Sequence, residues 1–428
     1  MPNFSIPLSG LTAESTALST IANNLSNQNT TGYKTKVVLF SDLFYQNLGT
    51  TGAGDPIQVG AGVQVGSTPS LFTQGSVSST GVATDVAIQG SGFFAVQDAS
   101  GVIRYTRAGA FSQLNNFLVT PAGQQVLGYP AVNGVIDTGT GIGPLQLGAG
   151  TISPPVATAN VQLSTNLNAA ASTTDPAFST PVTIFDSLGV PHFLSFTFTK
   201  TAANTWSYSV NIPAADLSPA TVNGNPVPPN PQLATGTLTF DGSGNLIADG
   251  VDNAGNPTLT NITGIPIAGF SDGASDMTFN WNVLDGGVPV LTQVAADSST
   301  TSIEKDGSSS GSLVKFTIGS DGIITGSFSN GKTQALGQLA LATFANNGGL
   351  QLEGDTNFSP TLASGQAVIG APTAGGRGSL SGGALELSNV DIATEFANLI
   401  VAQRGFESDA KAVTTFDQIT QDTIALKQ

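Results

Sequence analysis

Few side chains in this sequence could support catalysis or bind a metal ion. The 428 residues include one histidine, His192, and no cysteine. A lone imidazole without nearby histidine or cysteine companions is far more often structural than catalytic, so we expect His192 in a loop or at a strand edge. The missing cysteines exclude disulfide bonds and thiolate metal sites. We therefore predict no catalytic residue, no metal site and no cofactor.

An acidic loop that begins at Asp241 has the oxygen spacing of a calcium site. Oxygen-bearing side chains fall at positions 1, 3, 5, 9 and 12 of an EF-hand pattern, at Asp241, Ser243, Asn245, Asp249 and Asp252. Position 6, where that loop needs glycine, is Leu246, and the flanking residues resemble strands rather than helices. A plain hairpin turn is therefore the favoured interpretation, and a calcium site stays open as the alternative.

The overall composition favours a structural or binding protein. Only 9% of the residues are charged, against about 25% in an ordinary globular domain. The 12 basic and 28 acidic residues give a net charge of −16, which argues against nucleic acid or an anionic membrane as the partner. No apolar run reaches the roughly 18 residues of a membrane span. Residues 1–30 contain no Lys or Arg, so we expect no Sec-type signal peptide.

Both ends of the chain have the periodicity of helices. Near the N-terminus apolar residues alternate at spacings of four and three, which predicts a narrow a/d seam. These residues are Phe4, Leu8, Leu11, Leu18, Ala22 and Leu25. Asn27, Asn29 and Gly32 then favour the end of the helix.

At the other end, the stretch Ser388–Asp391 predicts the capped start of a second helix. Its apolar residues recur at threes and fours, with one gap of seven. They are Ile392, Phe396, Leu399, Phe406, Ala410, Val413, Phe416 and Ile419. Neither helix can bury its seam alone, so the two could pair within one chain or pack against other copies of the chain. The second arrangement would give a polymer.

The middle of the chain is predicted to be β-sheet. Short apolar segments such as Val86–Ile88, Phe93–Val96 and Thr237–Phe240 alternate with turn residues. The uncharged stretch 138–174 indicates a domain junction. The expected fold class is mainly β with α-helical termini.

The two ends carry residues that resemble the signatures of a known family. Residues 22–34, ANNLSNQNTTGYK, are similar to the N-terminal signature of the axial proteins of the bacterial flagellum, which comprise rod, hook and hook-associated proteins. Leu387–Asp391 and Val401–Phe406 resemble the C-terminal signature. The signature positions are Asn24, Asn27, Asn29, Thr31, Gly32, Tyr33, Lys34, Ser388, Asn389, Val390, Asp391, Gln403 and Arg404. Within the family the chain is most similar to hook proteins, because typical rod proteins lack so large an insertion.

This resemblance implies a set of discontinuous domains. Residues 1–30 and 384–428 would form a coiled-coil-like axial domain, and residues 31–70 a connector. Residues 71–155 and 298–383 would form an inner β domain, and residues 156–297 an outer β domain whose fold is least certain over about 245–310.

The resemblance also implies a non-enzymatic subunit that self-assembles into a curved, flexible tube and transmits torque from rod to filament. The expected assembly interface comprises Leu8, Leu11, Leu18, Leu25, Ile392, Phe396, Leu399, Phe406, Val413 and Phe416. The alternatives are a distal rod or hook-associated protein and, from another class, a secreted calcium- or carbohydrate-binding β protein.

The implied partners are flagellar proteins. They are further copies of the chain, a hook cap (scaffold) protein, a distal rod protein, a hook–filament junction protein and the flagellar type III export apparatus. Export through that apparatus, without a cleaved signal peptide, would place the protein outside the cell in the hook. We expect no nucleic acid partner and no membrane insertion.

Overall fold

The structure, a computed structural model, describes residues 4–132, 134–147, 152–218, 221–222, 225–226, 230–251 and 257–426. Asp252, the last position of the predicted acidic loop, lies outside these residues. The chain divides into two compact units. Unit 1 comprises residues 1–151, 313–327 and 333–428, and unit 2 comprises residues 152–312 and 328–332.

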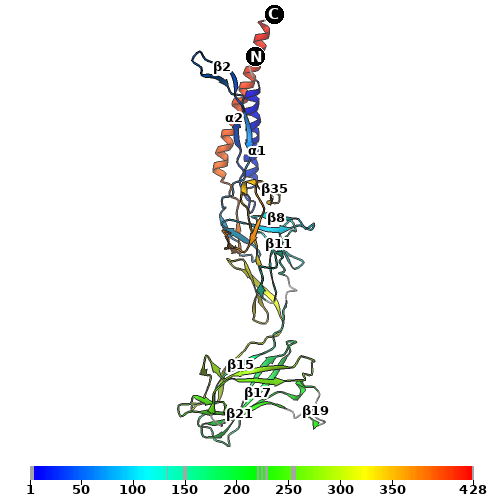
Figure 1. Cartoon of the computed structure of the whole chain (residues 1–428), viewed down its shortest axis with the longest axis vertical. Coiled ribbons are helices and arrows are strands. Elements are labelled where there is room, and N and C mark those ends of the chain that lie inside the picture. Colours follow the sequence, from blue (N-terminus) through cyan, green and yellow to red (C-terminus); the bar gives the residue numbers. More distant parts are fainter. Residues whose placement is uncertain are drawn as a thin grey trace. The chain divides into compact units, whose positions relative to one another are not determined.

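The two predicted terminal helices are present in unit 1. Helix α1 spans Ser5–Ser26 and helix α2 spans Ile392–Ala425 (Figure 1). The Asp391 carboxylate caps α2, because it accepts hydrogen bonds from the Ala393 and Thr394 amides at 2.9 and 3.2 Å. None of the described helices is long and apolar enough to cross a membrane.

The rest of unit 1 is β structure. Its main sheet follows the order β31-β32-β33-β11-β7-β8-β36-β35. In this sheet, strands that precede unit 2 in the sequence (β8 and β11) pair with strands that follow it (β36 and β33). The strands of this unit are β1 (Leu39–Asp42), β2 (Gln46–Thr50), β3 (Pro56–Val59), β4 (Val63–Ser67), β5 (Val77–Ser79), β6 (Val86–Gln89), β7 (Phe93–Gln97), β8 (Ile103–Thr106), β9 (Ser112–Leu114), β10 (Phe117–Val119), β11 (Gln125–Val132), β12 (Val135–Ile136), β13 (Gly143–Pro144), β31 (Gly311–Ile318), β32 (Ile323–Phe328), β33 (Thr333–Leu339), β34 (Leu341–Thr343), β35 (Gln351–Gly354), β36 (Asn357–Ser359), β37 (Val368–Gly370), β38 (Ser379–Gly382) and β39 (Ala384–Glu386).

The last two strands of unit 1 bring the C-terminal segment back to the N-terminal one. Strand β38 pairs with β6, and β39 pairs with β5 so that Glu386 lies opposite Val77. The 3₁₀ turn η2 (Asn347–Gly349) lies between β34 and β35. Aromatic rings fill the sheet core, where Phe94 contacts Phe111 with ring centroids 5.1 Å apart.

Unit 2 is a sandwich of two sheets. One has the antiparallel order β16-β17-β18-β21-β22, and in the other β15 pairs in parallel with β26 and β29 and antiparallel with β30. The elements are β14 (Ile152–Ser153), β15 (Asn160–Asn166), β16 (Phe178–Phe185), β17 (Pro191–Ala202), β18 (Thr205–Asn211), η1 (Ala214–Asp216), β19 (Thr221–Val222), β20 (Asn225–Pro226), β21 (Gln232–Phe240), β22 (Leu246–Ala248), β23 (Gly250–Val251), β24 (Pro257–Thr258), β25 (Ile262–Ile267), β26 (Met277–Asn282), β27 (Leu284–Asp285), β28 (Val288–Pro289), β29 (Leu291–Thr292) and β30 (Ser299–Lys305).

The core of unit 2 follows from strict alternation along its strands. In β17 the side chains of Leu194, Phe196 and Phe198 are buried, and the residues between them are more exposed. The Trp281 ring of the facing sheet contacts Phe196 and Tyr208 at centroid distances of 5.1 and 5.0 Å. The predicted fold class, mainly β with α-helical termini, is confirmed.

The pairing of β30 bears on the predicted domain boundary at 297/298. That prediction assigned Ser299–Lys305 to the inner β domain. The strand instead lies in unit 2 and pairs with β15 along its length. We therefore place the boundary of the proposed outer domain after this strand.

Candidate assembly surface

Helices α1 and α2 pack against each other in antiparallel directions (Figure 1). At one end Asn24 donates a hydrogen bond to the Glu395 carboxylate at 3.2 Å. At the other end the rings of Phe4 and Phe416 meet edge to face, with centroids 6.2 Å apart. The sequence left open whether the two terminal helices pair within one chain, and in the structure they do.

Alanines and Ile21 form the centre of the contact between the two helices, and Leu18, Leu25 and Leu399 pack against it. Ala13, Ala17 and Ile21 of α1 are buried, as is Ala402 of α2. Gly405 of α2 faces the Glu14 side chain of α1, since a Cβ atom there would lie 2.9 Å from Glu14 Oε1. The covered stripe of α1 is thus an alanine stripe beside the predicted leucine seam.

The predicted interface residues divide into two groups. Six are half-buried beside the helix contact, namely Leu11, Leu18, Leu25, Leu399, Val413 and Phe416. Four are exposed, namely Leu8, Ile392, Phe396 and Phe406. Phe396 is 51% exposed, and beside it α2 exposes Ile400 and Val401, of which Val401 is 70% exposed. Ile400 and Val401 were not predicted, because they fall outside the spacing of the predicted apolar seam of this helix.

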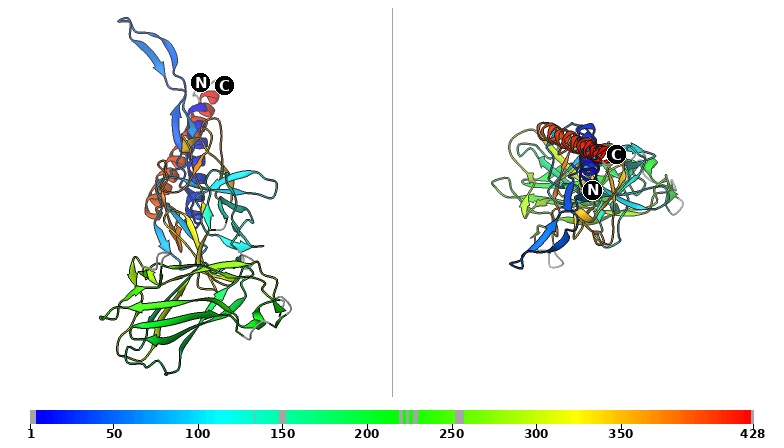
Figure 2. Two further views of the ribbon diagram at one scale, coloured as in Figure 1. Left: turned by 60° about the horizontal axis from the view of Figure 1, so that its bottom comes forward. Right: turned by 90° about the horizontal axis from the view of Figure 1, so that it is seen from above.

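A second exposed apolar group lies on the β2–β3 hairpin. Phe44, directly before β2, is 96% exposed, and Tyr45, Leu48 and Ile57 are also exposed. Figure 2 shows this hairpin extending away from the paired helices of unit 1. Its base is tied to α1, because the Val63 amide donates to the Ser9 hydroxyl at 3.1 Å. The hairpin lies in the segment predicted as a connector, and its apolar character was not predicted.

Several signature residues form a buried network instead of an exposed surface. The fully buried Glu386 carboxylate pairs with Lys34 at 2.6 Å and with Arg107 at 2.9 Å. Lys34 also donates to the Thr73 carbonyl, and Arg107 to the Gly90 and Gly92 carbonyls. Burial lowers the pKa values of Lys34 and Arg107, and the Glu386 carboxylate opposes that effect. Glu386 and Arg107 were not singled out from the sequence.

Two signature asparagines complete this network. Asn24 accepts the Lys36 amide at 3.0 Å and the Tyr33 hydroxyl at 3.1 Å. Asn389 accepts the Thr35 amide at 2.7 Å and donates to the Leu71 carbonyl at 2.8 Å. Each side chain therefore satisfies backbone groups of a neighbouring segment, which joins the end of α1 to the start of α2.

The turn after α1 requires its glycine. Gly32 has φ +69°, and a Cβ there would lie 2.6 Å from the Ala108 amide nitrogen. The helix ends at Ser26, as predicted, with Asn27 as its C-cap. Asn27 and Thr31 line a groove of about 620 Å³, and Asn29 is exposed.

The remaining signature positions lie around the start of α2. Ser388 accepts the Val390 amide at 3.3 Å, and Val390 is half-buried. Gln403 and Arg404 are exposed on α2, and within the described residues Arg404 makes no ion pair. These two side chains are therefore available to a neighbouring molecule.

The Asp241 loop is a closed hairpin turn between β21 and β22. Asp241 Oδ1 accepts the Ser243 and Asn245 amides, both at 2.8 Å, and Oδ2 accepts the Asn245 side-chain amide at 3.0 Å. These hydrogen bonds lower the pKa of Asp241. The one from the Asn245 side chain has the largest effect. Both carboxylate oxygens accept hydrogen bonds within the turn, and the β21–β22 pairing shows the expected hairpin, while the absence of a calcium ion stays a prediction.

Comparison with known proteins gives matches along nearly the whole chain. Residues 6–34 match the family described as flagella basal body rod protein, and residues 87–167 match the flagellar hook protein FlgE/F/G D1 domain. Residues 147–308 match the flagellar basal body protein FlaE D2 domain, and residues 381–426 match the flagellar basal body rod FlgEFG protein C-terminal family.

Full-length relatives are also found. The flagellar hook proteins FlgE of Salmonella typhimurium and Escherichia coli K12 are each 34% identical to this chain, over 99% of it and 100% of their own length. FlgE of Treponema pallidum is 34% identical over 98% of both chains. The crystal structure of Helicobacter pylori flagellar hook protein FlgE2 aligns with a TM-score of 0.47 and 15% identity, over 72% of this chain and 100% of that one.

Two paired helices at the ends of a chain that is otherwise β structure, with rod-type sequences at both ends, define a structural protein of the bacterial flagellum. Within that class the full-length identity is to hook proteins. The chain belongs to the flagellar hook protein FlgE family and is a structural subunit of the hook. The rod alternative and the calcium- or carbohydrate-binding alternative lose their support.

Proposed function

We propose that this subunit self-assembles through the exposed apolar faces of α2 and the β2–β3 hairpin into a curved, flexible tube that passes torque from rod to filament. In this proposal it is not an enzyme. Its binding partners are further copies of itself and the flagellar proteins at either end of the hook.

The observation that carries the proposal is the exposed apolar side of α2. One side of this helix is covered by α1, whereas Phe396, Ile400 and Val401 face solvent. A cluster of this kind on a helix that is already paired marks a site for another protein surface. A second copy of the chain supplies a fitting partner, because its own helices and its Phe44 hairpin expose apolar side chains in the same way.

The low fraction of charged residues in the chain suits a tube that bends. Only 9% of the residues are charged, so few ion pairs would lock neighbouring subunits in one register. Contacts among Ser, Thr and Asn side chains, direct or through water, can exchange at little cost. We assign tight packing to the terminal helices and sliding contacts to the β domains.

The same proposal covers domain roles and location. Residues 1–30 with 384–428 would form the axial domain, and unit 2 would supply the outer domain. The hook cap protein, the distal rod protein and the hook–filament junction protein are the proposed partners besides the chain itself. Export by the flagellar type III apparatus would place the subunit outside the cell.

The substitution Phe396→Asp tests the proposed interface. Complete burial of a phenylalanine side chain contributes about 1.5–3 kcal/mol, and about half of that remains for assembly because Phe396 is 51% exposed. Enclosing an unpaired carboxylate adds a further cost. We expect the threshold concentration for polymerisation to rise at least about tenfold, since 1.4 kcal/mol corresponds to one decade.

Two measurements on the full chain check this expectation. Sedimentation over a concentration series gives the threshold, and thermal melting of the monomer reports folding. Leu362→Asp, at a fully exposed loop leucine, is the matched control and should leave the threshold unchanged, while Phe396→Leu should restore assembly. A melting temperature that falls by many degrees in Phe396→Asp would show that the residue belongs to a core within the chain.

A further inference from the structure

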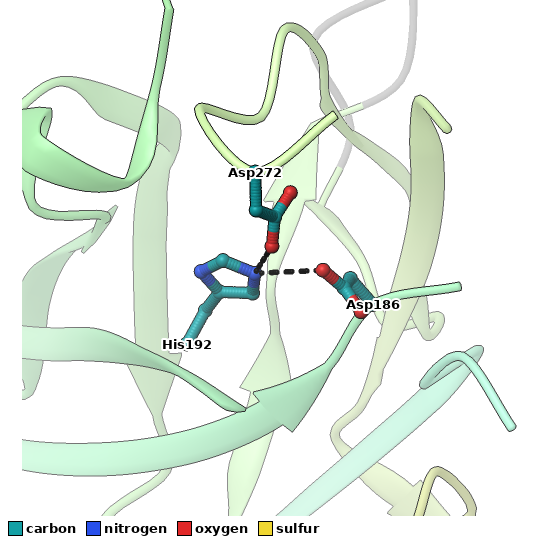
Figure 3. Close-up of side chains that lie close together, drawn as sticks. All are labelled: Asp186, His192 and Asp272. Atoms are coloured by element: carbon teal, nitrogen blue, oxygen red, sulfur yellow. Dashed lines mark hydrogen bonds and ion pairs between the residues drawn. The ribbon is translucent and has the colours of Figure 1, made fainter. Parts of the chain in front are cut away.

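The lone histidine of the chain lies between Asp186 and Asp272 in unit 2 (Figure 3), and Asp216 lies near its other ring nitrogen. His192 is the second residue of β17 and its side chain is only 4% exposed. Asp186 begins the turn before β17, Asp216 ends η1, and Asp272 lies in the loop between β25 and β26. Three segments, the β16–β17 turn, η1 and the β25–β26 loop, therefore meet at one imidazole ring, which also contacts the Phe270 ring at a centroid distance of 4.6 Å.

Two of the carboxylates are held in place by backbone amides. Asp186 Oδ1 accepts the Leu188 and Val190 amides at 2.8 and 2.9 Å, and Asp272 Oδ1 accepts the Ala274 amide at 2.9 Å. Each residue is left with Oδ2 directed at His192 Nε2, at 3.2 Å for Asp186 and 3.6 Å for Asp272. Fixed carboxylates of this kind are typical of ligands that are positioned before an ion binds.

The spacing of the three atoms fits a metal ion. Bonds from zinc to histidine nitrogen or carboxylate oxygen are about 2.0–2.2 Å long, so neighbouring ligands in a tetrahedral site lie about 3.4 Å apart. The distances of 3.2 and 3.6 Å from Nε2 fall on either side of that value. All three candidate ligand atoms lie within 4.8 Å of one another.

The charges around the imidazole also favour a cation. Three carboxylates surround one ring, and no lysine or arginine among the described residues pairs with any of them. Asp186 is fully buried, and two carboxylates that share one site repel each other unless a positive charge lies between them. A metal ion bound between the two carboxylates can supply that charge.

The other ring nitrogen favours the metal ion. His192 Nδ1 is buried and makes no hydrogen bond within the described part of the chain, and Asp216 Oδ2 lies 3.3 Å from it. A metal ion on Nε2 requires the proton on Nδ1, where metal-binding histidines usually donate to a carboxylate. Asp216 Oδ2 lies within reach of Nδ1 and could accept this hydrogen bond after a small reorientation.

We propose that Asp186, His192 and Asp272 bind a divalent transition-metal ion of the zinc type, and that Asp216 is a positioning residue which orients the imidazole. The single nitrogen ligand favours such an ion over calcium, which takes six to eight oxygen ligands. Asp272 is partly exposed, so water can complete the coordination. The bound ion would join the β16–β17 turn to the β25–β26 loop and stabilise unit 2.

The full-length chain, labelled with ¹⁵N-histidine, provides a direct test. Because His192 is the sole histidine, the imidazole gives one set of NMR signals and needs no assignment. On titration with ZnCl₂ at neutral pH we expect a saturable change of the Nε2 signal with one ion per chain. An imidazole signal that is unchanged by zinc would overturn the proposal.

Substitutions then locate the ligands. Asp272→Asn keeps the oxygen that accepts the Ala274 amide but removes the second carboxylate oxygen, and should weaken zinc binding more than tenfold. Asp276→Asn is the matched control, since Asp276 lies in the same loop, is exposed and accepts the Gly269 amide at 2.8 Å. Asp216→Asn should weaken binding by about 10–100-fold with unchanged stoichiometry. Equal affinities of the Asp272→Asn and Asp276→Asn chains would show that zinc binds elsewhere.

Discussion

Glu386 is the residue at which the two ends of the chain meet. Its carboxylate is fully buried and contacts Lys34 from the turn after α1 and Arg107 from the segment after β8. The Gly75 amide also donates to it at 3.0 Å. Two buried cations share this one carboxylate. Because the site is closed to water, the Glu386 charge is what stabilises Lys34 and Arg107 and the segments that carry them.

The substitution Glu386→Gln should therefore be strongly destabilising. It leaves Lys34 and Arg107 buried without a counter-charge, and breaking a buried pair in this way costs about 3–5 kcal/mol. Urea denaturation of the full chain measures the change. Glu353→Gln is the control, because Glu353 pairs with Arg104 at 2.7 Å on the surface and its loss should have a much smaller effect. Equal losses for both variants would contradict the role given to Glu386.

The sequence identified many residues of this buried network but did not predict their contacts. Asn24, Gly32, Lys34 and Asn389 were marked as signature positions, yet their hydrogen bonds lie within the chain and not on an exposed face. Glu386 was missed because its partners are 352 and 279 residues away in sequence. Asp272 was missed for the same reason, because the fold brings a distant loop to His192, whereas Asp186 is only six residues from His192 and was overlooked.

At the level of elements, the terminal helices show what periodicity can and cannot predict. Spacings of three and four located α1 and α2 closely, and the Asp391 cap of α2 was expected from its residue type. The same spacing does not tell which stripe is covered by a partner in the same chain. In the structure the covered stripe of α1 contains Ala13, Ala17 and Ile21, and the leucines pack at its margin.

The contact between α1 and α2 brings two acidic residues together, which predicts a pH effect. Burial and the nearby Asp409 charge raise the pKa of Glu14 above its ordinary value of 4.5. The folded chain then binds more protons than the unfolded one just above that pH, so this group's contribution to stability falls as the pH rises through the raised pKa. Acidification towards pH 4 removes the penalty.

Glu14→Gln should remove this dependence. At pH 7 we expect the variant to be more stable than the native chain by about 0.5 kcal/mol, the scale of a solvent-screened pair, and near pH 4 the two should be alike. Thermal melts followed by the helical circular dichroism signal at both pH values give the difference. An advantage of the variant that is the same at pH 4 and pH 7 would mean that charge is not its cause.

At the level of the whole molecule, unit 2 is an insertion with closely spaced ends. Val156 and Ser308 form an antiparallel bridge in which each amide donates to the other residue's carbonyl at 2.9 Å. Bridged residues of this kind lie about 5 Å apart, so a short linker can replace everything between them. Directly before and after this bridge, Ile152 and Ser312 pair in β14 and β31 and would remain joined.

A deletion of residues 156–308, closed by a short Gly-Ser linker from Pro155 to Ser309, tests the proposed division of labour. This cut removes β30 together with its partner β15, whereas a cut at Ser298 would leave β30 as an unpaired strand. If α1, α2 and the β2–β3 hairpin carry the assembly contacts, the shortened chain should still sediment as a polymer. Electron microscopy should then show tubes that are straighter or more easily dissociated than those of the native chain, because the sliding outer contacts are gone. A shortened chain that melts cooperatively yet never polymerises would show that unit 2 itself carries an essential assembly contact.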